Sequence, residues 1–182
     1  QRGARLMRIA VTGTPGTGKT TAADQLETDL SVIHLNERIT EEGLTTGHDE
    51  DRDSAIADLD AVRLSLDGRE DILVESHLAH NIPADRVVVL RCRPDELEQR
   101  LADRGESEAS ISENAESEAL DVILGAADVR HGLDNIYEIE TTERSPGAVA
   151  AEIESAADGT REPSAGTVSY TEYLVHPLCS RR

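Results

Sequence analysis

The stretch that most constrains the fold of this 182-residue chain lies near its beginning, at residues 7–29. The aliphatic run "MRIAVT" is followed directly by "GTPGTGKTT", and residues 19–29 have the pattern of a helix. The spacing G-x-x-x-x-G-K-[ST] between a strand and a helix predicts a phosphate-binding loop. The residues that match this spacing are Gly13, Gly18, Lys19 and Thr20. The stretch therefore predicts the opening of an α/β fold with a site for phosphate groups.

Lys19 in this loop is the only lysine of a chain that has seventeen arginines. Glycines let the loop turn its backbone N–H groups toward phosphate oxygens, and the start of the next helix adds partial positive charge. The Lys19 ammonium can reach the β- and γ-phosphates as a compact charge, whereas a guanidinium fixes its contacts in a rigid fork. Thr20 is expected to ligate magnesium. The loop therefore predicts ATP and Mg²⁺ as cofactors.

The remainder of the chain alternates between strand and helix patterns. Aliphatic runs predict strands at residues 31–35, 71–76, 84–92 and 136–141. Helices are predicted at residues 94–103 and 146–157, each of which begins with proline. Helical spacing also relates Ile56, Leu59, Val62, Arg63 and Leu66. Continuous aliphatic strands are typical of parallel sheets covered on both faces, so we predict a three-layer α/β fold with a central five-stranded parallel sheet.

The charge of the chain indicates the medium in which it works. Asp and Glu number 37 against 18 Lys and Arg, which gives a net charge of -19. Such a surface suits concentrated salt, where repulsion between like charges is screened, so we expect a salt-adapted source. It also repels phosphate backbones, so we expect no strong direct binding of nucleic acid. The regular aliphatic runs exclude a chain that is disordered throughout.

The two ends of the chain differ from its middle. Residues 1–6 precede Met7 and carry no acid, so we interpret them as an extension upstream of the natural start. Residues 7–158 are expected to form one domain, and residues 159–182 a C-terminal arm with one strand near Val168. Two distant cysteines without C-x-x-C spacing favour a reduced cytoplasm and an inert role, and no apolar run is long enough for a membrane helix. These cysteines are Cys92 and Cys179.

A second group of functional side chains is predicted at the end of the third strand. Glu75 ends "ILVE", and His77 follows two residues later. Open α/β sheets bind ligands at the carboxyl edge, so both side chains can face the phosphate loop. Glu75 would then bind magnesium, either directly or through a water molecule. Taken alone, the pair equally fits a solvated strand end and a turn histidine.

Five segments in this order and spacing resemble the adenylate kinase isoenzyme six family. They are "GTPGTGKTT", "VESH", "VVVLRCRP", "LEQRLADRG" and "SENAESEALD". Members of that family are small nucleoside monophosphate kinases that also act as ATPases in maturation of the small ribosomal subunit. The resemblance implies a P-loop kinase fold with a monophosphate-binding insertion at residues 34–56 and a short lid at residues 103–113.

The resemblance also implies roles for individual residues. Arg104 would be the lid arginine, and Glu75 with His77 would form the metal and hydrolysis pair. The residues that would hold ATP are Gly13, Gly16, Gly18, Lys19, Thr20 and Thr21. Two features depart from the family: Asp is usual where Glu75 stands, and the lid sequence "RGESEASISE" has neither lysine nor the usual aromatic residue.

Three other arginines have open roles. Arg100 shares a helix face with Arg104, so it can clamp phosphates, but it equally suits ion pairs with the neighbouring acids. Arg38 and Arg52 are the only cations of the monophosphate region, where either can contact AMP. Their acidic neighbours favour a solvated charged face instead.

The predicted function is transfer of the terminal phosphate of ATP to AMP or a related monophosphate, with ATPase activity. The resemblance adds a ribosomal protein of the small subunit as a partner. Two alternatives stay open at this point: an ATP-hydrolysing assembly factor with little kinase activity, and a P-loop kinase for a sugar or another small acceptor.

Overall fold

Strand β1 (Arg8–Gly13) lies at the centre of a five-stranded parallel sheet in a computed structural model that describes residues 7–51 and 54–175. The order of the sheet is β2-β5-β1-β6-β7. The other four strands are β2 (Ser31–His34), β5 (Ile72–Glu75), β6 (Arg86–Arg91) and β7 (Ile136–Glu140). The predicted α/β fold with five parallel strands is therefore confirmed.

The carboxyl end of β1 is the point at which the chain changes direction across the sheet. From β1 the chain crosses to β2 on one side, and later segments build β6 and β7 on the other side. Ligands bind at such switch points because the loops there diverge and leave a crevice. The register places Glu75 beside both Val11 of β1 and His34 of β2.

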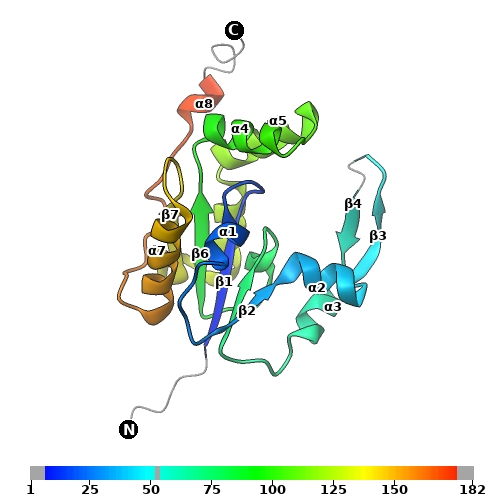
Figure 1. Cartoon of the computed structure of the whole chain (residues 1–182), viewed down its shortest axis with the longest axis vertical. Coiled ribbons are helices and arrows are strands. Elements are labelled where there is room, and N and C mark those ends of the chain that lie inside the picture. The colour runs from blue at the N-terminus through cyan, green and yellow to red at the C-terminus, as the bar shows by residue number, and fades with distance from the viewer. Residues whose placement is uncertain (1–6, 52–53, 176–182) are drawn as a thin grey trace.

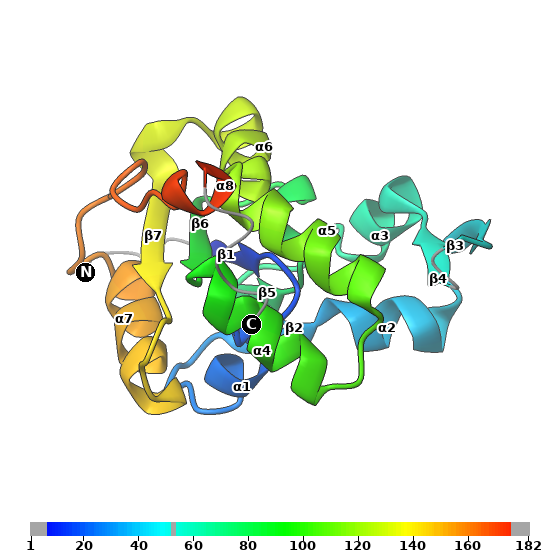
Figure 2. The same cartoon turned by 90° about the horizontal axis from the view of Figure 1, so that it is seen from above.

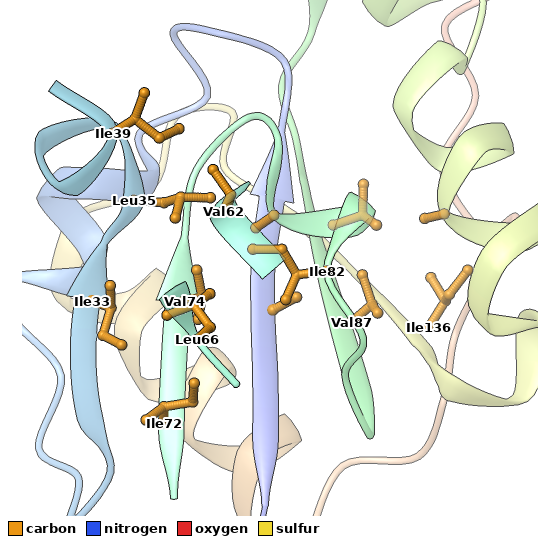
Figure 3. Packing of buried hydrophobic residues seen from close by; sticks show 14 residues of the cluster. Ile33, Leu35, Ile39, Val62, Leu66, Ile72, Val74, Ile82, Val87 and Ile136 are labelled. Carbon is orange, nitrogen blue, oxygen red and sulfur yellow. The ribbon is translucent and has the colours of Figure 1, made fainter. Parts of the chain in front are cut away.

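Helices cover both faces of the sheet (Figures 1 and 2). On one face α1 (Lys19–Ala23) and α7 (Pro146–Asp158) contact each other, and α6 (Val122–His131) packs on the opposite face. Successive residues of a strand point to opposite faces, so each aliphatic run supplies both layers. Val87 and Val89 of β6 join one apolar cluster, which Figure 3 shows, while Val88 joins the other.

Two helices lie beyond the carboxyl edge of the sheet, where the lid was predicted. Helix α4 (Pro94–Asp103) has the predicted bounds, and α5 (Glu108–Ala119) follows after a short turn, with Ser107 capping its first turn. A small buried cluster holds the pair together and consists of Cys92, Leu97 and Leu101, with Ile111 packed against it. The predicted lid range thus contains the α4–α5 turn and the start of α5.

The predicted monophosphate region contains α2 (Leu35–Glu42), β3 (Thr45–Asp49) and β4 (Ser54–Ala57). The antiparallel β3–β4 hairpin projects away from the main sheet (Figure 1). Helix α3 (Leu59–Ser65) follows and begins at an Asp58 cap. The predicted helical pattern was wrong at Ile56, which lies in β4 with 47% of its surface exposed.

Other sequence predictions need correction at their edges. Helix α1 ends at Ala23 rather than Asp29. Beyond it the hydrogen bonds join residues three apart instead of four, as in the bond from Leu26 N–H to the carbonyl of Ala23. No strand forms near Val168 in the described part of the arm, which instead has one bridge between Ser164 and Tyr137. The arm continues into α8 (Glu172–Val175), and two single-turn helices occur elsewhere, η1 (Ala79–Asn81) and η2 (Leu133–Asn135).

Some sequence predictions fall outside the described residues. They concern residues 1–6, Arg52 and Cys179. Within residues 7–51 and 54–175, none of the helices has the length and apolar character needed to cross a membrane.

Candidate functional site

The phosphate loop connects β1 to α1 in the centre of the sheet. Gly13 has a φ of 148°, and a Cβ there would lie 2.6 Å from the Leu90 carbonyl oxygen and 2.8 Å from Thr17 Oγ1. Only glycine fits so close an approach of backbone to backbone. Gly16 and Gly18 also have positive φ, at 93° and 90°. The loop conformation therefore requires the glycines that the sequence pattern singled out.

The ammonium of Lys19 lies inside the loop. Its Nζ donates to the carbonyls of Gly13 and Thr14, at 2.9 and 3.0 Å, and lies 3.5 Å from Thr17 Oγ1. Burial lowers the pKa of Lys19 to about 8, which the charge of Glu75 partly opposes. The side chain therefore remains mainly charged at neutral pH and has its charge at the centre of the loop.

Glu75 joins the loop to the neighbouring strand. Thr20 Oγ1 donates to Glu75 Oε1 at 2.8 Å, and His34 Nδ1 lies 3.1 Å from the same oxygen. The other ring nitrogen of His34 lies 3.4 Å from Asp24 Oδ1. Glu75 is almost fully buried. The structure therefore brings together the two predicted magnesium ligands.

His34 and Asp24 are members of this site that sequence reasoning missed. His34 stands at the carboxyl end of β2, in register with Glu75. The sequence carried a signal for it, because a histidine that ends an aliphatic strand of a parallel sheet lies at the ligand-binding edge. Asp24 follows α1 and gave no signal, since its approach to His34 depends on how early that helix ends.

His77 lies near the same charges. Burial lowers its pKa to about 4, and the positive charge of Lys19 acts in the same direction, while Glu75 opposes both. The imidazole is therefore neutral at pH 7 and is a weak proton acceptor. The shift arises from the surroundings of the ring in the fold, because burial is its largest cause.

A cavity of about 380 Å³ opens beside the loop, between α1, α4 and the segment that leads from β7 into the first turn of α7. The lining residues are Gly16, Thr17, Gly18, Thr21, Ala22, Arg100, Asp103, Arg104, Thr141, Arg144, Pro146 and Val149. Four residues predicted to hold ATP or to act on it are among them, namely Gly16, Gly18, Thr21 and Arg104. The exposed Arg104 is close enough for its charge to lower the pKa of Lys19. The residues from Thr141 onward were not predicted, because a turn after the last strand carries no recognisable motif.

The other arginines have definite partners. Arg100 pairs with Glu96 and also donates to the carbonyls of Gly16 and Thr141, so it both forms the expected ion pair and fastens the loop to the β7–α7 segment. Arg38 donates to the Ser65 carbonyl and pairs with Glu42. Its guanidinium thus ties α2 to α3 and is largely buried, rather than lying on the solvated charged face that its acidic neighbours favoured.

Comparison with known proteins places the chain in a family. The family model described as "AAA domain" matches residues 9–121, which is more than half of the chain. The chain belongs to this family. A relative from Natronomonas pharaonis is 64% identical and covers 92% of this chain and 100% of its own length. A relative from Halobacterium salinarum is 60% identical over the same shares. A third, from Methanocaldococcus jannaschii, is 36% identical and covers 91% of this chain and 94% of its own length.

All three relatives carry the name "Putative adenylate kinase", and the first two come from halophilic archaea. Solved structures show a related fold at low identity. A shikimate kinase from Acinetobacter baumannii in complex with shikimate has a TM-score of 0.60 at 19% identity, covering 86% of this chain and 95% of its own. A gluconokinase from Sinorhizobium meliloti has a TM-score of 0.54 at 18% identity, covering 85% and 93%. The chain thus has the fold of P-loop kinases.

Proposed function

We propose that the chain is a nucleoside monophosphate kinase that transfers the γ-phosphoryl group of MgATP to AMP or a related monophosphate. One observation carries the proposal: the single lysine of the chain lies in a complete phosphate loop, beside the oxygen pair of Thr20 and Glu75. The names of the archaeal relatives support AMP as the acceptor. The resemblance of the motifs supports the narrower assignment to the adenylate kinase isoenzyme six family.

ATP would lie along the loop with its base in the adjoining cavity. The backbone N–H groups between Gly13 and Thr21 would surround the phosphates. Pro146 and Val149 provide apolar surface for a base, while Arg144 and Thr141 add polar groups. This arrangement assigns a role to the β7–α7 connection and the first turn of α7, which no sequence motif indicated.

Mg²⁺ fits the side chains present. Thr20 and Glu75 offer a hydroxyl and a carboxylate oxygen side by side, and hard oxygen donors are what this ion prefers. Groups of three or more His, Cys, Asp or Glu that could hold a metal by themselves are absent from residues 7–51 and 54–175. The ion would therefore complete its shell with phosphate oxygens and water, and when bound it would neutralise charge on the phosphates.

The protein's own part in the reaction is positioning and charge neutralisation. Lys19 would leave the carbonyls of Gly13 and Thr14 for the phosphate oxygens, which are stronger acceptors because they are charged. Arg104 would bring a second positive charge from the lid turn. The acceptor phosphate is already an anionic nucleophile, so transfer needs no strong base. The predicted monophosphate region, residues 34–56, would hold AMP.

A direct test measures products from ATP and candidate acceptors in concentrated KCl by chromatography. We expect two ADP from each ATP and AMP, and no comparable product with a sugar or shikimate. Lys19→Ala should lose this activity while keeping its unfolding transition. Lys19→Arg is the matched variant: it keeps the charge but not the compact ammonium, so it should also be severely impaired. Near-normal turnover in either variant, or preference for a sugar, would contradict the proposal.

A second activity, ATP hydrolysis, is favoured by His77. This neutral imidazole lies where the charges of Lys19 and Glu75 both act on it, so it can accept a hydrogen bond from a water molecule near the γ-phosphate. The resemblance links such hydrolysis to maturation of the small ribosomal subunit through a ribosomal protein. A test is whether a purified small-subunit ribosomal protein binds the chain and is released by ATP. Failure of every such protein to bind would remove this second role without affecting the kinase proposal.

A further inference from the structure

A buried carboxylate on α5 contacts the phosphate loop from outside. Thr14 Oγ1 donates to Glu118 Oε2 at 2.6 Å, and Glu118 is only 3% exposed. Glu118 belongs to the segment "SENAESEALD", whose residues had no assigned role in the predicted site. It therefore connects the helix after the lid turn with the second residue of the loop.

Thr14 is the residue through which this contact reaches Lys19. Its carbonyl oxygen accepts from Lys19 Nζ at 3.0 Å and from Thr17 Oγ1 at 2.9 Å. The backbone N–H of Thr17 donates to the same carbonyl at 3.2 Å. Holding the Thr14 hydroxyl therefore fixes the peptide that orients both the lysine and the turn of the loop.

Glu118 is itself held on its second oxygen. Arg91 Nε and the backbone N–H of Cys92 donate to Glu118 Oε1, at 2.8 and 3.1 Å. Both carboxylate oxygens thus have partners, which a buried charge requires. Arg91 and Cys92, at the end of β6, therefore hold one oxygen of the carboxylate in place, and Thr14 donates its hydroxyl hydrogen bond to the other oxygen.

Arg91 is anchored in turn. Its guanidinium is 1% exposed and also pairs with Asp121 and Glu138. Burial acts to lower the pKa of Arg91, but the surrounding carboxylates outweigh it and the pKa is raised, so the arginine is charged. The C-terminal arm also contacts this network of ion pairs. Thr167 N–H donates to Glu138 Oε2, and the centre of the Tyr170 ring lies 5.4 Å from the guanidinium carbon of Arg91.

We propose that Glu118 is a positioning residue for the phosphate loop, which it holds in the nucleotide-binding conformation through the Thr14 hydroxyl. The inference rests on the proposed binding of ATP by this loop. A buried ion pair can also serve stability alone, and the two roles differ in a measurable way. A structural role changes the unfolding transition only, whereas a positioning role changes the affinity of the folded protein for nucleotide.

The test is calorimetric titration of MgATP into the full chain in concentrated KCl, well below the unfolding temperature. Thr14→Val removes the hydroxyl at nearly constant volume, and Glu118→Gln removes the charge. We expect each to raise the dissociation constant about ten-fold, which corresponds to about 1.4 kcal/mol. Thr14→Ser keeps the hydroxyl, so its dissociation constant for MgATP should remain within about two-fold of the wild-type value.

The matched control is Asp58→Ala, which removes the cap of α3 outside the Arg91 network and makes no contact with the loop. It should lower the melting temperature, because a lost cap costs about 1 kcal/mol, and leave the dissociation constant within about two-fold of wild type. Wild-type affinity in both Thr14→Val and Glu118→Gln would overturn the inference, as would equal losses in Thr14→Ser and Thr14→Val. If the wild type bound no MgATP, or Lys19→Ala bound it equally well, the proposed function itself would fail.

Discussion

Replacement of Gly16 by alanine tests the packing of the phosphate loop against helix α4. Gly16 has a φ of 93°, in the left-handed region that L side chains rarely adopt. A Cβ there would lie 2.8 Å from Leu97 Cδ1 and 2.9 Å from Leu101 Cδ2. Both leucines are buried in the small cluster with Cys92, so neither can move without disturbing its neighbours.

The expected loss follows from two contributions. The left-handed backbone costs an alanine about 1–2 kcal/mol relative to glycine. Forcing a methyl group into a filled core costs about 1–3 kcal/mol more. Gly16→Ala should therefore lower the free energy of unfolding by about 2–5 kcal/mol. Gly68→Ala is the matched control, because Gly68 has a φ of 70° with no heavy atom within 4 Å of its Cβ position, so only the first contribution applies.

Urea unfolding at a fixed, high KCl concentration measures both variants on one scale. The difference between them isolates the steric contribution at the loop, about 1–3 kcal/mol. MgATP affinity should fall in Gly16→Ala and remain unchanged in Gly68→Ala, since only the first displaces the loop. Equal destabilisation by the two substitutions would refute the reasoning, because it would mean that the leucine side chains yield at no cost.

Three further predictions concern other parts of the molecule. Because 37 acidic residues repel one another in a chain of net charge -19, the melting temperature should rise as KCl is raised from about 0.1 M to several molar, and a constant value in a thermal scan would show that the acidity has another cause. His77→Ala should lower AMP-independent ATP hydrolysis about ten-fold, the effect of losing one hydrogen bond to the attacking water, while AMP-dependent transfer falls much less; equal losses in the two assays would place His77 in the shared magnesium site. Burial raises the pKa of Cys92 to about 11, so in a Cys179→Ser background a thiol reagent at neutral pH should react only on unfolding, and rapid labelling of the native protein would contradict this.

The local part of the fold and of the site could be predicted from the sequence. The strand, loop and helix around Lys19 are contiguous in the chain, and their spacing is fixed by the geometry of one turn. The buried strands were recognisable because each must be apolar on both faces. The β3–β4 hairpin was not, because it is largely exposed on both faces and its residues show no alternation of apolar and polar side chains.

Contacts between distant segments depend on the tertiary structure. Glu75 and Thr20 are 55 residues apart in the chain and meet because β5 pairs in register beside β1. Glu118 and Thr14 are 104 residues apart and meet only through the placement of α5 over the carboxyl edge of the sheet. The pKa of His77 likewise depends on what surrounds it rather than on its neighbours in sequence. The sequence by itself therefore determined the phosphate loop and the sheet, because short-range spacing and burial dictate both. Only the tertiary structure decided which side chains hold and tune that loop, because this depends on strand register and helix docking.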